Sequence, residues 1–310
     1  MKQNHSEVSA FIAIDKPAGI SSFGVISRLR KLTGIRKIGH CGTLDPFATG
    51  LLVCCIGSYT RLARFVEAED KSYLATIQLG KRSSTGDPEG CITETAEIPY
   101  SIPNPRQIVD NALLLQELPV PAYSAIKVEG KRAYSLARAG IELAMPKRQT
   151  RISLFTFINR EDGSLINSLG ELSYRCTVSK GTYIRSLSEW LAKQMDTVAY
   201  TIQLRRESIG NISINQAVAI GELTNENWQD YLLSTKFVLE NLIPRELDES
   251  QVKQVLNGGD IELLESLDGA PQADMLVSER PTYSLYDYTG RLIAIGEEQN
   301  MLIHPIIVLK

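Results

Sequence analysis

The sequence lacks the patterns that mark membrane, secreted and nucleotide-dependent proteins. No apolar run in its 310 residues approaches the ~20 residues needed to span a bilayer, and residues 1–7 lack the apolar core of a signal peptide. The five cysteines are odd in number and form no Cys-x-x-Cys pair, which argues against a disulfide framework and a zinc site. Neither a P-loop nor a dinucleotide fingerprint occurs. We therefore expect a cytoplasmic protein without membrane contact, metal or cofactor.

The net charge of −3 is unevenly distributed along the chain. Residues 1–242 contain 28 Lys and Arg against 24 Asp and Glu, a balance of +4, whereas residues 243–310 contain 5 against 12, a balance of −7. One segment, 28–37, contains five basic residues and no Asp or Glu: Arg28, Arg30, Lys31, Arg36 and Lys37. Such a cluster is often a solvated helix face, but it is also the pattern that contacts nucleic-acid phosphates.

The strongest signal is the stretch 39–57, which places a single carboxylate between glycines. Gly42 and Gly50 lack a Cβ and permit backbone conformations that other residues avoid. Between them stands Asp45, which the following proline pushes towards an extended backbone. The apolar run 51–56 then predicts a strand buried on both faces. An Asp-Pro pair is commonly a helix cap, yet a carboxylate on a stiff turn before a core strand also has the support that a reactive group needs.

This stretch resembles the catalytic motif of the TruB family of tRNA pseudouridine synthases, Gly-His-x-Gly-x-Leu-Asp-Pro-x-Ala-x-Gly. The matching residues are Gly39, His40, Gly42, Leu44, Asp45, Pro46, Ala48 and Gly50. The resemblance implies that Asp45 is the catalytic aspartate, acting as a nucleophile or a base. It also suggests that His40 fills the gap left by a flipped base, although a lone histidine is more often structural.

Two further segments carry candidate contacts to the substrate. Residues 71–80 have the mixed alternation of a strand, and the resemblance implies that Tyr73 lies against the target base and is a candidate proton acceptor. The plain alternative is a tyrosine at the edge of the core. In the polar loop that follows, the resemblance links Asp87 to support of the active site. Residues 60–66 predict a helix on which Arg61 is available to contact phosphate.

A second family motif, Tyr123-Ser-Ala-x-Lys127, makes Lys127 a candidate substrate contact. The match continues at Gly130, Ala137, Arg138 and Gly140. Further along the chain, the resemblance places Leu204 at the position that lines the uracil pocket.

The third motif, 174–187, supplies the expected partner of the aspartate. We expect a strand to Val178, a turn and a helix that carries Arg185, with Tyr183 as a further substrate contact. The resemblance implies that Arg185 pairs with Asp45. An arginine is permanently charged and engages a carboxylate through two parallel hydrogen bonds. Such a partner would lower the pKa of Asp45 by roughly 1–3 units.

The resemblance implies an α+β fold in two parts. Residues 1–242 are expected to form the catalytic domain, a mixed, largely antiparallel sheet with helices, which includes a helix over 105–118. Residues 243–310 are expected to form a small C-terminal β-barrel of the PUA-like kind, with turns at 258–259 and 288–290. The acidic balance of this smaller part departs from that of a module that grips RNA. We expect a monomer.

These features favour a cofactor-free enzyme that isomerises uridine to pseudouridine. The resemblance implies the uridine at position 55 in the TΨC arm of tRNA, so the TΨC stem-loop is the expected partner. The reaction breaks the glycosidic bond to N1, rotates the base and rejoins it to the sugar through C5. The base must first be flipped out of its stack, which costs a few kcal/mol.

Three other functions remain open at this point. A guide-RNA-dependent pseudouridine synthase shares the chemistry, but the chain shows no long Lys-rich tail. A non-catalytic RNA-binding or tRNA-folding protein would not need every catalytic position. A hydrolase using Cys41 and His40 is disfavoured because neighbours in an extended chain point to opposite faces. Cys41 is expected to be a small packing residue.

Overall fold

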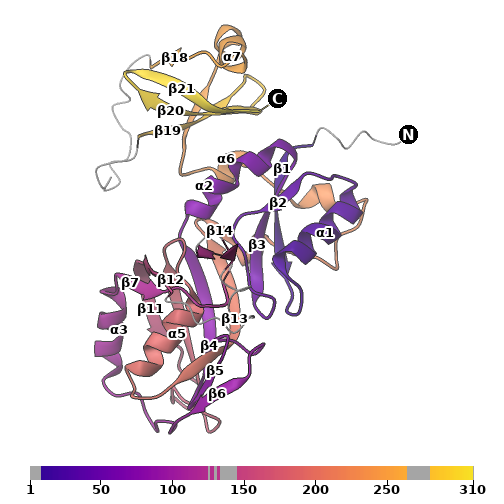
Figure 1. Cartoon of the computed structure of the whole chain (residues 1–310). Helices are drawn as coiled ribbons and strands as arrows, with labels where there is room; N and C mark the ends of the chain where they lie inside the picture. The colour runs from indigo at the N-terminus through magenta and orange to yellow at the C-terminus, as the bar shows by residue number, and fades with distance from the viewer. Residues whose placement is uncertain (1–7, 125, 129–130, 133–144, 264–279, 310) are drawn as a thin grey trace.

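The computed structural model describes residues 8–124, 126–128, 131–132, 145–263 and 280–309, and two β-sheets contain most of the strands in these ranges (Figure 1). In these residues the larger sheet has ten strands. Seven lie side by side in the order β11 (Ile152–Phe157), β12 (Glu171–Val178), β4 (Lys71–Leu79), β13 (Ala199–Ile209), β3 (Thr49–Ile56), β1 (Ala10–Lys16) and β15 (Val218–Ala219). Three short strands add to it: β14 (Ile212–Ser213) on β13, β2 (Ile38–His40) on β3 and β16 (Leu232–Leu233) on β1.

The pairing in this sheet confirms the expected fold class. Among the described strands of this sheet, only β1 with β15 and β3 with β13 pair in parallel, and the other neighbours are antiparallel. The sheet is therefore mixed and largely antiparallel, with helices packed against it, as predicted.

Strand β3 is the shared centre of two hydrophobic clusters. Its side chains alternate between them and are almost all fully buried. One cluster takes Leu51, Val53 and Cys55, and the other takes Leu52, Cys54 and Ile56. The strand predicted to be buried on both faces is confirmed, and it gives the loop before it a rigid base.

Helix α1 (Ser22–Thr33) is capped at both ends. The Ser21 hydroxyl accepts a hydrogen bond from the Gly24 amide at 3.0 Å, and Gly34 ends the helix with φ of +74°. A left-handed residue of this kind is the common way to end a helix. The apolar side chains Val25, Ile26 and Leu29 face the core, whereas Arg28 and Lys31 are exposed.

Helices α3 (Pro105–Leu113) and α5 (Ile184–Lys193) pack near one end of the sheet, α3 against β11 and α5 against β13 and β4 (Figure 1). The helix expected over 105–118 is too long. Residues 117–119 form β7 (Glu117–Pro119), which pairs with β10 (Lys147–Gln149). This partner lies some 30 residues away, so local periodicity does not reveal it. No helix in the described ranges is both long and apolar enough to cross a membrane.

The remaining short elements connect these parts. They are β5 (Lys81–Ser83) with β6 (Ile92–Thr95), β8 (Lys127–Val128) with β9 (Lys131–Arg132), α2 (Ala63–Ala68), α6 (Thr235–Val238), and 3-10 turns at Gly57–Leu62, Ile214–Gln216 and Trp228–Tyr231. The helix predicted over 60–66 is thus the end of a 3-10 turn that continues into α2.

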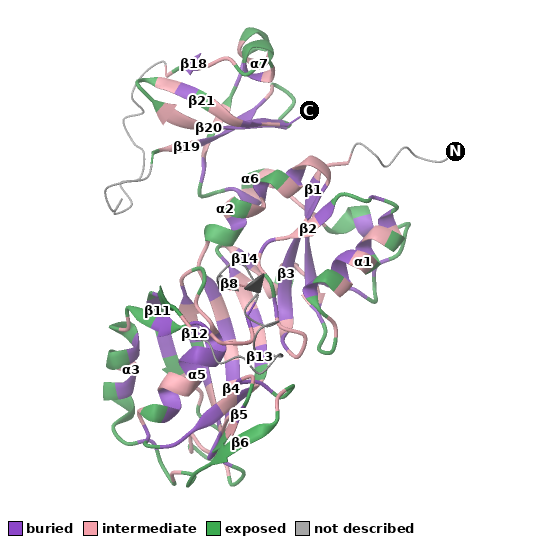
Figure 2. Ribbon diagram, in the orientation of Figure 1, coloured by how far each residue is buried: buried purple, intermediate pink, exposed green. Residues whose placement is uncertain are grey.

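The second sheet is small and curled, and it lies at the C-terminal end of the chain (Figures 1 and 2). Its order is β17 (Ile243–Glu246), β19 (Thr282–Tyr286), β20 (Leu292–Gln299), β21 (Leu302–Val308) and β18 (Ile261–Glu262). Helix α7 (Glu249–Leu256) packs against it and begins with a capping box, in which Asp248 and Gln251 bond each other's backbone amides. This half-barrel agrees with the expected PUA-like segment.

The two sheets meet through apolar side chains. Tyr286, Leu292, Ile295, Ile307 and Leu309 of the smaller sheet belong to the same hydrophobic cluster as Tyr59, Leu62 and Val66. Burial of apolar area therefore holds the C-terminal part in place, and an ion pair between Lys236 and Glu246 adds to it.

We expect Gly50→Ala to destabilise the protein more than Gly34→Ala. Both glycines have positive φ, but a Cβ at Gly50 would lie 2.3 Å from the Arg206 backbone oxygen, whereas Gly34 faces open space. Holding an alanine at the positive φ of Gly34 costs about 1 kcal/mol of folding free energy. The added overlap raises the cost to about 3 kcal/mol at Gly50. Urea unfolding followed by circular dichroism compares the two; equal losses would contradict the close contact between β3 and β13.

Candidate active site

Asp45 lies on the loop between β2 and β3, where two glycines bend the chain. Gly42 and Gly50 have φ of +98° and +100°. Within the loop the Ala48 amide donates to the Asp45 carbonyl oxygen at 3.1 Å and closes a turn. The Asp45 side chain is 33% exposed, so a substrate can reach a carboxylate whose backbone is fixed.

The residues on either side of Asp45 are held by the connection between β1 and α1. The Ser22 hydroxyl accepts from the Leu44 amide at 2.8 Å and donates to the Leu44 carbonyl at 3.0 Å. On the other side, the Lys16 ammonium donates to the Pro46 carbonyl at 3.2 Å. Lys16 is fully buried, and burial lowers its pKa to about 8. Both peptide neighbours of the aspartate are therefore anchored.

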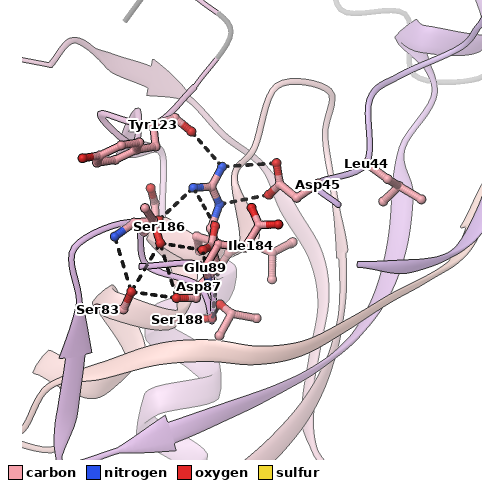
Figure 3. Close-up of polar contacts among 12 residues, drawn as sticks. Leu44, Asp45, Ser83, Asp87, Glu89, Tyr123, Ile184, Ser186 and Ser188 are labelled. Carbon is pink, nitrogen blue, oxygen red and sulfur yellow. Dashed lines mark hydrogen bonds and ion pairs between the residues drawn. The ribbon is translucent and has the colours of Figure 1, made fainter. Parts of the chain in front are cut away.

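Arg185 approaches Asp45 from the first turn of α5. Figure 3 shows the polar contacts around Asp45, Asp87 and Tyr123. The Nε of Arg185 lies 3.0 Å from Oδ2 of Asp45 and its Nη2 lies 3.3 Å from Oδ1, which is a two-bonded ion pair. Backbone oxygens hold the guanidinium from its other side: Nη1 donates to Thr85 at 2.8 Å and Nη2 to Tyr123 at 3.1 Å. With 4% of its side chain exposed, Arg185 is fixed in one orientation.

A second carboxylate shares this guanidinium. Asp87 Oδ2 lies 3.3 Å from Arg185 Nη1, and the Asp87 side chain is buried. Its other oxygen accepts hydrogen bonds from the Thr85 hydroxyl and the Glu89 amide. Asp87 thus contacts Arg185 from the protein side, where it can orient the arginine.

The pKa of Asp45 is shifted in the direction opposite to the one expected. Burial raises the pKa of Asp45 above its ordinary value of 3.8, and the Asp87 carboxylate adds to the increase. The Arg185 guanidinium lowers the pKa without outweighing burial. The expected lowering is wrong because it considered the arginine but not the loss of water around the carboxyl. A carboxylate with a raised pKa is the stronger base once ionised.

Tyr73 and Leu204 lie beside the loop on neighbouring strands. Both belong to the hydrophobic cluster that contains Leu44 and Ile184, the residues next to Asp45 and Arg185 in the chain. The structure therefore brings these candidates to one region. Each is 7% exposed, so the expected stacking of Tyr73 on a base, and its part in proton transfer, stay predictions.

His40 and Cys41 do not form a catalytic pair. The Nδ1 of His40 is buried and has no hydrogen-bond partner among the residues that the structure describes. Burial, and then the charge of Arg206, lower the pKa of His40, so its ring is neutral at pH 7. Cys41 is fully buried, and its sulfur lies 3.0 Å from that of Cys55 in an apolar cluster. This is the packing role expected for Cys41.

The remaining candidates lie at different distances from the aspartate. Tyr183 directly precedes α5 and is half-buried. The backbone of Lys127 forms part of β8, but its side chain lies outside the described part of the chain, as do Gly130, Ala137, Arg138 and Gly140. Arg61 follows the far end of β3, ~25 Å of extended chain from the loop, and donates to the Val308 carbonyl at 2.6 Å. The structure does not bring Arg61 to Asp45.

Sequence reasoning missed three residues that shape this site. Lys16 and Ser22 lie outside the three motifs that supplied most of the candidate residues. Arg206 carries a charge yet is 1% exposed. Charged or hydroxyl side chains are usually at the surface, and nothing in the order of residues marks these three as buried.

The arrangement offers a reachable carboxylate, a fixed guanidinium and an apolar wall. Within the described ranges no three or more His, Cys, Asp and Glu side chains are grouped so that they could hold a metal ion. A carboxylate in this setting can act as a nucleophile or a base, and the arginine orients it.

Comparisons with known proteins place this site in a family. The family model described as TruB family pseudouridylate synthase (N terminal domain) matches residues 30–184. The chain is 33% identical to tRNA pseudouridine synthase B of Paenarthrobacter aurescens, over 97% of this chain and 95% of the relative. It is 35% identical to tRNA pseudouridine synthase B of Syntrophomonas wolfei, over 94% and 93%.

Solved structures support the fold. A chain in the crystal structure of a Cbf5-Nop10-Gar1 complex is similar with a TM-score of 0.68 at 18% identity, over 99% of this chain and 85% of that chain. At this identity the similarity concerns architecture alone, and it agrees with a large mixed sheet followed by a curled C-terminal sheet.

The raised pKa of Asp45 predicts how Asp45→Asn changes stability with pH. The folded protein holds the Asp45 proton more tightly than the unfolded chain, so its stabilising contribution is complete below pH 3.8 and is lost as the pH rises through the raised folded value. Asparagine is neutral throughout. We therefore expect the variant to gain stability relative to wild type as the pH rises, measured by urea unfolding between about pH 3 and pH 7.

Asp162→Asn is the control with the opposite sign. Hydrogen bonds from Ser164 lower the pKa of this exposed carboxyl. Its contribution is therefore present above the ordinary value and lost as the pH falls through the lowered one, so the variant should lose relative stability as the pH rises. The same direction in both variants would show that Asp45 is not shifted upwards.

Proposed function

The chain belongs to the TruB family of pseudouridylate synthases, and from this membership we propose that it isomerises the uridine at position 55 in the TΨC arm of tRNA. It is a pseudouridine synthase, and relatives above 30% identity named tRNA pseudouridine synthase B support tRNA as its substrate. The observation that carries the proposal is the two-bonded Asp45–Arg185 pair, in which Asp45 stands on a glycine-flanked loop inside the matched region and Arg185 directly follows that region.

The surface beside the loop suits an RNA substrate. Helix α1 exposes Arg28 and Lys31, and Arg36 and Lys37 are exposed shortly after it. The same helix carries Ser22, which bonds the residue before Asp45. Phosphates bound by this helix would therefore contact the element that also holds the loop of the carboxylate. Their neutralisation would offset the few kcal/mol that flipping a stacked uridine costs.

The isomerisation moves one bond and one proton. The bond from C1′ to N1 breaks, the base rotates, and a bond from C1′ to C5 forms, while C5 loses a proton and N1 gains one. We assign Asp45 as the nucleophile or base and Arg185 as its orienting partner. Tyr73 is the residue against the base and the candidate acceptor of the C5 proton, and Leu204 is the apolar wall of the uracil pocket.

The other contacts are assigned by their placement. His40, neutral and half-buried at the end of β2, is proposed to fill the gap left by the flipped base. Asp87 supports Arg185, and Tyr183 and Lys127 are proposed to contact the tRNA. Arg61 is left out of the site, because its guanidinium bonds the C-terminal sheet.

The division into a catalytic domain over 1–242 and a PUA-like domain over 243–310 is part of the proposal. It is supported by β17, which begins at Ile243 and belongs to the second sheet. The shared apolar cluster predicts that the two domains stay together in a monomer.

A guide-RNA-dependent synthase is the second candidate. The similarity to a chain of a Cbf5-Nop10-Gar1 complex favours it, but only at the level of fold. The two candidates differ in whether a guide RNA is needed.

The assay uses a tRNA transcript labelled with tritium at C5 of uridine, because the new carbon bond releases that atom. With no guide RNA, the wild-type chain should release tritium from this transcript and not from one with cytidine at position 55. Asp45→Asn should abolish release while tRNA affinity is retained, because the amide keeps the shape but not the nucleophilicity. A rate within about tenfold of wild type would sink the assignment of Asp45.

Arg185→Lys should lower the rate by about a hundredfold, because a point charge cannot keep both bonds to Asp45 and lets the carboxylate shift by ~1 Å. Arg175→Lys is the matched control: its guanidinium also makes two bonds to a carboxylate, that of Glu207, but at the surface. The control should keep the wild-type rate. Equal rates for the two variants would show that Arg185 does not orient Asp45.

A further inference from the structure

We propose that Arg206 is a positioning residue for Asp45, which anchors both ends of the segment 42–50 and so sets where the carboxylate stands. The inference rests on the proposed function for its kinetic readout. Arg206 lies in β13, in register with Gly50 of β3 on one side and Tyr73 of β4 on the other. Its place is therefore between the loop and the strand that carries the candidate base contact.

The guanidinium of Arg206 bonds both ends of the segment. Its Nε donates to the Leu51 carbonyl at 2.7 Å, directly after the segment. Its Nη2 donates to the Gly42 carbonyl at 3.1 Å, where the segment begins. A guanidinium is planar and rigid, so the separation of these two carbonyls is set by the geometry of one side chain.

The backbone of Arg206 makes a third contact with the same segment. Gly50 packs so closely that a Cβ on it would lie 2.3 Å from the Arg206 oxygen and 2.8 Å from its nitrogen. Gly42 packs on the side chain, with Nη1 at 3.6 Å from the place of its Cβ. Both bending glycines of the loop thus rest on this one residue.

Stability alone does not explain an arginine at this position. Burying a cation costs several kcal/mol, and an apolar side chain of similar size often serves stability as well or better. Among the described residues Arg206 forms no ion pair with a carboxylate, so two backbone carbonyls supply its hydrogen bonds. Because both hydrogen bonds of the Arg206 guanidinium go to the two ends of the segment 42–50, we infer that the arginine fixes the shape of this segment.

The charge of Arg206 also acts on other groups behind the loop. Second to burial, it lowers the pKa values of His40 and Lys71. It therefore helps to keep His40 neutral beside the loop.

The experiment compares Arg206→Met with wild type in the full chain. Single-turnover tritium release with enzyme in excess should be about a hundredfold slower, the effect of a ~1 Å displacement, while the Kd for tRNA changes by less than about threefold. Arg206→Lys keeps the buried charge but not the planar group that donates to both carbonyls, so its rate should also stay well below wild type. Arg175→Met is the control that removes the same group from the surface, and it should keep the wild-type rate.

Hydrogen exchange provides a readout that does not depend on the reaction. In Arg206→Met the amides of residues 43–45 and 47–49 should exchange at least about tenfold faster, with the rest of β3 and β13 unchanged. If wild type proves inactive on tRNA, the proposed function fails, but this measurement still decides the inference. Unchanged loop exchange, a wild-type rate in the folded Met variant, a loss confined to Kd, or failure of both Arg206 variants to fold would each overturn it.

Discussion

The two-bonded ion pair between Asp45 and Arg185 is the constraint on which the rest of the site depends. Its partners are 140 residues apart in the chain, so it forms only if the β2–β3 loop and helix α5 are both placed to within a fraction of an ångström. Strand β3 gives the loop a fully buried base, and α5 packs on β13 and β4. The large sheet therefore serves as the frame that brings a loop and a helix end together.

Burial, more than charge, sets the properties of this protein. At the site, loss of water raises the pKa of Asp45 even though Arg185 lies in contact with it. The arginine also faces Asp87, so its charge is divided between two carboxylates. At the other end of the molecule, an acidic segment is attached through apolar side chains such as Tyr286 and Leu292. For the pKa of Asp45, the expectation drawn from the charge of Arg185 alone was wrong.

Much of the fold and the principal pair of the site could be predicted from the sequence. The strand over 51–56 and the helix carrying Arg185 depend on signals within a few residues, an apolar run and a turn. Asp45 was recognisable because its whole motif is contiguous. Interactions between near neighbours in the chain survive into the folded state, which is why these predictions agree with the structure.

Other features were decided only by the tertiary structure. Ser22 holds Leu44, and Arg206 holds Gly42, across 22 and 164 residues of chain. The helix expected over 105–118 stops early because its end pairs with β10. The direction of the Asp45 pKa shift depends on how much water the folded loop excludes. Sequence alone therefore determined which residues could react and which local elements form. Their anchoring and electrostatics followed from which distant segments meet, because hydrogen bonding and desolvation depend on distance in space and not on position in the chain.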